Sequence, residues 1–172
     1  MTPSKVRLFI TLFVTILLIF GCNKDNKVSA VNNFSIYLVK EDLSATEAMS
    51  KNLDDLALED IPVLTDEEIS IYNWKEHVFT LKEGFNLEEK LEGKVPISGK
   101  PFVVVADSER IYLGSFWNPI SSLYMPEIPT IYSMWFKGND KDTYTINYGN
   151  EQKDPRDDIR IYDSLKGLGK TF

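Results

Sequence analysis

The chain has 172 residues, of which 43% are hydrophobic, and its formal net charge is −7. This composition provides one ordinary domain with a hydrophobic core and excludes a fibrous or intrinsically disordered chain. Removal of residues 1–21, which contain two basic residues and no acid, would leave a net charge near −9. Nucleic acid is therefore disfavoured as a partner, because binding it requires a basic surface. Anionic lipids would not attract the domain either.

The first 21 residues have the anatomy of a signal peptide. Lys5 and Arg7 provide the positive start, and residues 8–20 are apolar except for two threonines. This apolar run is shorter than the roughly 20 residues that a membrane-spanning helix needs. The sequence therefore predicts a signal peptide over residues 1–21.

The end of this segment, Ile19-Phe20-Gly21-Cys22, resembles the lipobox of bacterial lipoproteins. The resemblance implies cleavage before Cys22, a diacylglycerol on its sulfur and often an acyl chain such as palmitate on its amino group. Cys22 is the only cysteine, so no internal disulfide competes for its sulfur. Two or more acyl chains suffice for stable anchoring. We therefore expect a protein anchored by lipid to the extracytoplasmic face of the cell membrane.

The rest of the chain divides into a tether and one domain. Residues 22–33 are polar and show no apolar periodicity, which predicts the lipidated cysteine followed by a flexible tether. Residues 34–172 are expected to form the globular domain.

Two strands and three helical starts are predicted before residue 98. The strands are residues 34–39 and 76–82, the second of which contains His77. Capping patterns predict helices at residues 44–47, 65–68 and 86–89, the second being a short turn that ends near Ser70. An apolar stripe extends the first helix, and its members are Ala45, Met49, Leu53 and Leu56.

A hairpin at residues 98–117 is predicted to be the centre of the sheet. Phe102 to Ala106 is an unbroken apolar run, typical of a strand buried on both faces. A polar connection, residues 107–110, leads to a second strand from Ile111 to Trp117.

The last third is predicted to contain one helical turn, a second hairpin and a final helix. Asn118-Pro119 indicates a helical turn through Ser122, and residues 130–136 and 143–148 are expected to pair as strands. Asp154-Pro155 predicts the start of the last helix, whose apolar face would be Ile159, Tyr162 and Leu165.

This order of elements predicts the α+β class. We expect a single domain with a mixed, mainly antiparallel β-sheet and helices packed on it, preceded by the signal peptide and tether. The helices between the early strands leave room for parallel neighbours.

The sequence offers little catalytic or metal-binding chemistry. His77 is the only histidine, no serine lies in a Gly-x-Ser-x-Gly motif, and Cys22 is assigned to lipid. We therefore assign no catalytic residue, no cofactor and no metal site, and interpret His77 as a strand residue beside Phe79. Asp140 and Asp142 lack the remainder of a calcium loop.

Paired acids are the other candidates for chemistry. Glu67-Glu68 and Glu88-Glu89 are adjacent at helix starts, where neighbouring side chains point apart and negative charge is favourable. We interpret them as structural.

Aromatic residues crowd the second half of the chain. Trp117, Tyr124 and Trp135 are predicted to form an exposed binding patch, centred on the proline-bearing segment Phe116 to Tyr132. Such side chains also fill cores, so their exposure decides between the two roles.

Three functions follow from these observations. The first is a non-enzymatic interaction or accessory role at the cell envelope, with a protein partner. The second is binding of a small ligand or cell-wall fragment, which requires a concave pocket. The third is a carboxylate-based hydrolase, which requires two acids facing one cleft.

Overall fold

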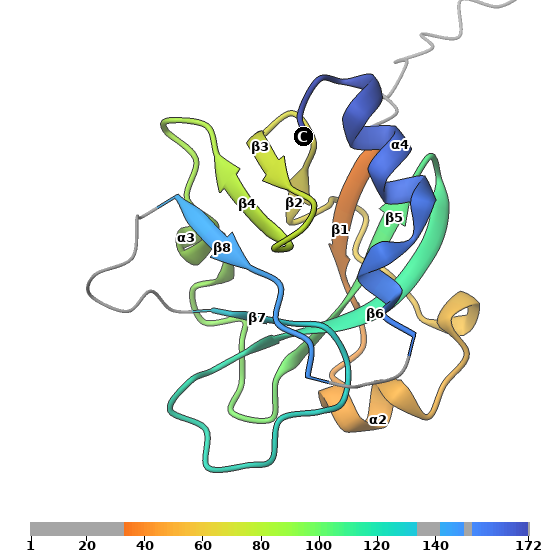
Figure 1. Cartoon of the computed structure of the whole chain (residues 1–172). Coiled ribbons are helices and arrows are strands. Elements are labelled where there is room, and N and C mark those ends of the chain that lie inside the picture. The colour runs from red at the N-terminus through yellow and green to blue at the C-terminus, as the bar shows by residue number, and fades with distance from the viewer. Residues whose placement is uncertain (1–32, 134–141, 150–152, 172) are drawn as a thin grey trace, which may run out of the picture. The chain divides into compact units, whose positions relative to one another are not determined.

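The computed structural model describes residues 33–133, 142–149 and 153–171, and these form one α+β domain (Figure 1). The signal peptide, Cys22, the tether, Asp140 and Trp135 lie outside the described residues. No helix among the described segments has the length and apolar character needed to cross a membrane.

The larger sheet has five strands in the order β2-β1-β5-β6-β7. All neighbours are antiparallel except β6 and β7, which are parallel. The strands are β1 (Phe34–Leu38), β2 (Leu64–Thr65), β5 (Lys100–Ala106), β6 (Glu109–Trp117) and β7 (Thr130–Tyr132).

The smaller sheet has three antiparallel strands in the order β3-β4-β8. They are β3 (Ile69–Asn73), β4 (Val78–Leu81) and β8 (Thr143–Thr145). Phe79 and Tyr144 lie opposite each other in this sheet, and their rings stack with centroids 5.4 Å apart. The predicted mixed, mainly antiparallel arrangement is confirmed.

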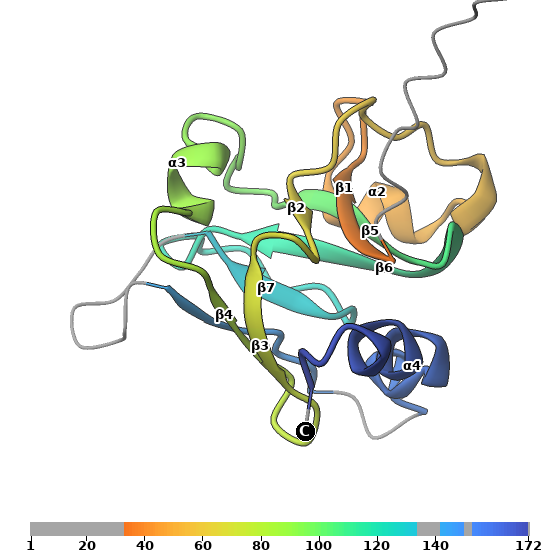
Figure 2. The same cartoon turned by 90° about the horizontal axis from the view of Figure 1, so that it is seen from above.

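Short helices cover both sides of the larger sheet. The α-helices are α2 (Ala45–Met49), α3 (Leu87–Leu91) and α4 (Ile159–Gly167), and the 3-10 helices are η1 (Leu53–Asp55) and η2 (Pro155–Asp157). Figure 2 shows α4 and the smaller sheet on one side of the larger sheet and α2 on the other.

The central strand β5 is buried on both faces, as predicted. Phe102, Val104 and Ala106 belong to the main core, which both sheets, α3 and α4 share. Val103 belongs to a second core beneath α2 and η1. Arg110 fastens that second layer, because its guanidinium donates to the carbonyl oxygens of Leu53 and Leu56 at 2.6 and 2.8 Å.

The central hairpin closes through a two-residue turn. Ala106 pairs with Glu109, and the intervening Asp107 and Ser108 have φ values of +48° and +69°. Two left-handed residues make a type I′ turn, whose twist matches that of the flanking strands. The second strand therefore begins earlier than Ile111, the start that the polar connection suggested.

Two predicted helical segments are wrong. Residues 66–68 form a turn between β2 and β3. Glu68 is buried there, and its carboxylate accepts from the Thr65 N–H and the Lys90 ammonium. Asn118 accepts from the Ile120 N–H at 3.1 Å, but this closes a turn without a helix.

Two predicted helices are shorter than expected. The Ser44–Glu47 capping box is present, but α2 ends at Met49, and Leu53 lies in the separate η1. The last helical segment is divided because Asp154 caps η2 and Asp158 then caps α4.

The shift at the last helix changes which of its residues are buried. Ile161 and Leu165 belong to the core, whereas Ile159 is 61% exposed. The predicted apolar face is therefore correct at Leu165 and wrong at Ile159.

The predicted second hairpin is also wrong. β7 pairs with β6 and β8 pairs with β4, so each strand extends a different sheet. Among the residues of this pair that the structure describes, only Thr130 and Asn147 pair across, with N–H to carbonyl distances of 2.8 and 2.7 Å in the two directions. This bridge joins the two sheets.

We expect Gly114→Ala to destabilise the domain, because a Cβ at this position would lie 2.3 Å from the buried Phe102 ring and 2.8 Å from the Pro129 carbonyl oxygen. Overpacking of this kind costs about 1–3 kcal/mol of unfolding free energy. Urea unfolding measures the loss. Gly149→Ala is the control, because a Cβ there meets nothing within 4 Å, and equal stability of the two variants would contradict the prediction.

Candidate functional site

Five large apolar side chains are exposed on two neighbouring loops. We call them the loop surface: Ile97, Ile120, Leu123, Tyr124 and Met125, which are 61%, 75%, 51%, 99% and 46% exposed. The Ser121 hydroxyl donates to the Ile97 carbonyl oxygen at 2.6 Å and joins the two loops. Several large apolar side chains exposed on adjoining loops are typical of an interaction site.

The sheet topology explains why this loop is long and exposed. β6 and β7 are parallel, with Ser115 opposite Thr130 and Trp117 opposite Tyr132. After Trp117 the chain must therefore run back alongside β6 before β7 begins opposite Ser115. Such a crossover needs about a dozen residues. Residues 118–129 form this crossover without a helix. Pro126 and Pro129 fix the φ angles at their own positions in it.

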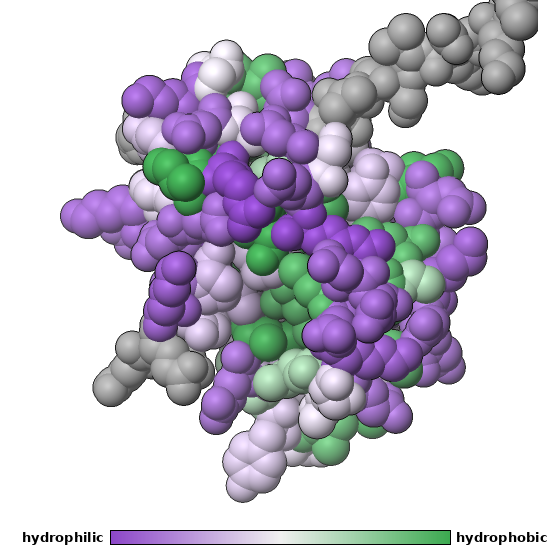
Figure 3. Space-filling view, turned by 90° about the vertical axis from the view of Figure 1, so that its right-hand side faces the viewer, coloured by the Kyte–Doolittle hydropathy of each residue, from purple (hydrophilic) through white to green (hydrophobic). Residues whose placement is uncertain are grey.

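The same loop borders an apolar groove. Figure 3 shows hydrophobic side chains gathered between polar ones on the side of the molecule that carries α2 and β6. The groove has a volume of about 310 Å³, and Lys51 and Glu127 are its charged lining residues. Its apolar lining includes Met49, Leu53, Leu113, Ile128, Pro129 and Pro155.

Of the two predicted patch residues that the structure describes, Tyr124 is exposed and Trp117 is not. Tyr124 is almost fully exposed, whereas Trp117 is only 5% exposed and packs against Gly99. Trp117 is therefore a core residue, and we remove it from the patch. The aliphatic neighbours of Tyr124 were missed, because sequence reasoning searched for aromatic residues only.

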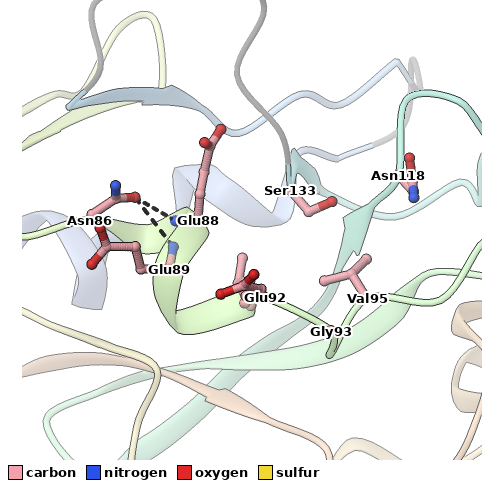
Figure 4. Close-up of a pocket in the computed structure, with 9 residues that line it drawn as sticks. Asn86, Glu88, Glu89, Glu92, Gly93, Val95, Asn118 and Ser133 are labelled. Atoms are coloured by element: carbon pink, nitrogen blue, oxygen red, sulfur yellow. Dashed lines mark hydrogen bonds between the residues drawn. The ribbon is translucent and has the colours of Figure 1, made fainter.

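A second hollow of about 430 Å³ lies beside α3 and is partly acidic (Figure 4). Glu88 and Glu89 line it, and Figure 4 shows them pointing in different directions, as predicted for adjacent helical residues. Asn86 caps this helix and accepts from both of their N–H groups. The pair thus has the structural role that we expected at a helix start.

His77 lies in the turn before β4 and contacts two acids that are distant in sequence. Its Nε2 is 3.4 Å from Asp157 Oδ1 and 4.0 Å from Asp154 Oδ2. The other ring nitrogen, Nδ1, is 3.2 Å from the Tyr72 hydroxyl oxygen. His77 is only 6% exposed and has a left-handed backbone, with φ +50°. The contacts of its ring therefore fix His77 in the turn before β4, and the prediction that it is a strand residue is wrong.

Arg156 holds this cluster together. Its Nε donates to both carboxylate oxygens of Asp154, at 2.9 and 3.1 Å, and Nη1 donates to the Ile146 carbonyl oxygen. The pKa of Asp154 is lowered: burial acts against this, but the hydrogen bonds and charge of Arg156 prevail. Asp154 is therefore a carboxylate at neutral pH.

The pKa of His77 is also lowered. Burial has the largest effect and the positive charge of Arg156 adds to it, while Asp154, Asp157 and Glu76 act in the opposite direction. The imidazole is therefore neutral at neutral pH, which leaves one ring nitrogen with an available lone pair.

Sequence reasoning missed this cluster because His77 and the two acids are far apart in the chain. Asp154 was identified only as a helix cap, a role that it does have for η2. The sequence signal that could have pointed to the cluster was His77 itself, the only histidine, within the predicted strand of residues 76–82.

No protein family, no curated protein and no solved structure matches this chain.

The neutral state of His77 predicts a pH dependence of stability. A histidine whose pKa is lower in the folded state binds its proton more readily when unfolded, so stability is present above the ordinary value of 6.5 and is lost as pH falls below it. We expect the melting temperature of the wild type to fall between about pH 6.5 and 5, where carboxylates are still ionised. His77→Gln should show a shallower fall, and parallel curves would contradict the prediction.

Proposed function

We propose that the chain is a lipid-anchored protein of the extracytoplasmic face of the cell membrane, with a non-enzymatic role in binding a protein partner at the cell envelope. Cys22 carries the lipid in this proposal, and the loop surface binds the partner. The observation that carries it is the set of five exposed apolar side chains on the loop surface. An exposed aromatic ring is a common anchor at protein interfaces.

The charge of the chain favours a protein rather than lipid as the occupant of the loop surface. The acidic net charge opposes contact with anionic headgroups.

The surface also indicates the chemistry of the partner. The loop surface and groove present apolar side chains of moderate size, so a partner segment with aliphatic or aromatic residues would fill them. A basic rim on that partner would complement the acidic domain and speed association. We therefore propose a partner with an apolar centre and a basic rim.

Binding of a small ligand is the second candidate, and the groove is the observation that favours it. Its volume of about 310 Å³ is at the small end for ligand pockets. The hydrolase hypothesis has less support, because Glu88 and Glu89 point apart. The pKa values of Glu47, Asp154 and Asp158 are lowered, which does not suit these three carboxyls to the role of a general acid.

For the anchor, we expect cells that express the full-length chain to incorporate labelled fatty acid into it, and Cys22→Ala to abolish the label. The reason is that Cys22 carries the only thiol. Asn26→Ala, a change in the expected tether, should keep the label. Labelling of the Cys22→Ala form would refute the proposed attachment.

For the partner, we expect Tyr124→Ala and Ile120→Ser to abolish a crosslinked partner that intact cells show with the wild type. With the isolated partner, each variant should weaken binding at least tenfold, about 1.4 kcal/mol, because central anchors dominate interface energies. Ile61→Ser is a matched control, since Ile61 is 79% exposed and Ile120 is 75% exposed.

Three outcomes test whether the loop surface binds a protein partner or lipid. Equal loss with Ile61→Ser, or no loss with either loop variant, would overturn the loop surface as the partner site. Vesicles of phosphatidylethanolamine and phosphatidylglycerol are the lipid arm, and binding that Tyr124→Ala abolishes would replace the partner with membrane. The melting temperatures of all variants should equal that of the wild type, because these side chains are exposed.

A further inference from the structure

His77, Asp154 and Asp157 bring three potential metal-ligand atoms within 4.8 Å of one another. They come from two segments: His77 from the turn before β4, and the two acids from the cap and the last residue of η2. We propose that these three residues bind a divalent transition-metal ion of the Zn²⁺ type.

The distances fit an ion better than a hydrogen bond. His77 Nε2 and Asp157 Oδ1 are 3.4 Å apart, beyond the usual 2.7–3.2 Å for a nitrogen–oxygen hydrogen bond. Two ligands of a tetrahedral zinc ion, each about 2.1 Å from the metal, lie about 3.4 Å apart. Asp154 Oδ2, at 4.0 Å from Nε2, already accepts hydrogen bonds from Arg156 Nε and Nη2, and it would complete the set by moving closer to the imidazole.

The imidazole is already held in the orientation that a metal ligand needs. Its Nδ1 is hydrogen-bonded to the Tyr72 hydroxyl, which leaves Nε2 directed at the two acids. Metal-ligating histidines almost always bind an oxygen through the second nitrogen, which fixes the ring. Trp74 packs edge-on against the ring, with centroids 5.7 Å apart, and limits its rotation further.

The imidazole is buried with its Nε2 facing the two carboxylates. His77 is 6% exposed, and its Nε2 is 3.4 Å from Asp157 Oδ1 and 4.0 Å from Asp154 Oδ2. An ion between these ligands would bind the nitrogen and both carboxylates at once. Asp157 is largely exposed, so the site is open to entry and to water at the remaining coordination positions.

Arg156 decides which ion is favoured. Its bidentate contact with Asp154 holds that carboxylate in place, as outer partners of metal ligands do, but it also cancels one negative charge. The remaining charge is too small to favour Ca²⁺ or Mg²⁺, which rely on several oxygen ligands. A neutral imidazole with carboxylates suits Zn²⁺ and its transition-metal neighbours.

The test is calorimetric titration of ZnCl₂ into the full-length Cys22→Ala chain in detergent, after removal of metal by a chelator. The Cys22→Ala background removes the only thiol that would bind zinc elsewhere. We expect one ion per chain and a rise of several degrees in the melting temperature, because the ion binds only the folded arrangement. Co²⁺ should give visible absorption bands at the same stoichiometry.

Variants connect the ion to these residues. His77→Gln and Asp157→Asn should each weaken zinc binding at least tenfold, whereas Asp163→Asn, at an exposed position of α4, should leave it unchanged. Asp157 is exposed, so its substitution tests the site even if His77→Gln disturbs folding. Absence of binding, binding that survives both substitutions, or a preference for Ca²⁺ or Mg²⁺ would each overturn the proposal.

Discussion

The burial of β5 on both faces is the constraint on which the rest of this domain depends. One face of the strand belongs to the main core shared with the smaller sheet, α3 and α4, and the other contributes Val103 to the layer beneath α2 and η1. The backbone of β5 is also paired along both edges, by β1 and β6. The remaining elements therefore divide into those that cover one face and those that cover the other.

The parallel pairing of β7 with β6 creates the exposed loop that carries the proposed binding surface. An antiparallel neighbour would have needed only a short turn, and the apolar residues of the loop surface would have had no loop to occupy. The parallel register instead requires a long return segment that lies outside the core. Exposure of Tyr124 is thus a consequence of strand order as well as of composition.

The elements predicted correctly depend on local chemistry, and the errors depend on pairing. The Ser44–Glu47 capping box, the Asn86 cap and the apolar run of β5 are visible within a few residues, and all three are present. The prediction that residues 130–132 and 143–145 pair with each other was wrong, because these successive strands are edge strands of different sheets. Likewise, Trp117 and Tyr124 are both aromatic residues near a loop, but Trp117 packs against Gly99 and is buried, whereas Tyr124 is exposed.

The two proposed sites differ in how they relate to the stability of the fold. The loop surface is made of exposed side chains, so changing them removes contacts with a partner and leaves the core intact. The histidine cluster instead joins η2 to the turn before β4, and Arg156 continues that junction to the Ile146 backbone beside the smaller sheet. An ion bound there would strengthen a connection that the fold already uses. Metal binding and stability should therefore change together at His77, whereas partner binding and stability should change separately at Tyr124.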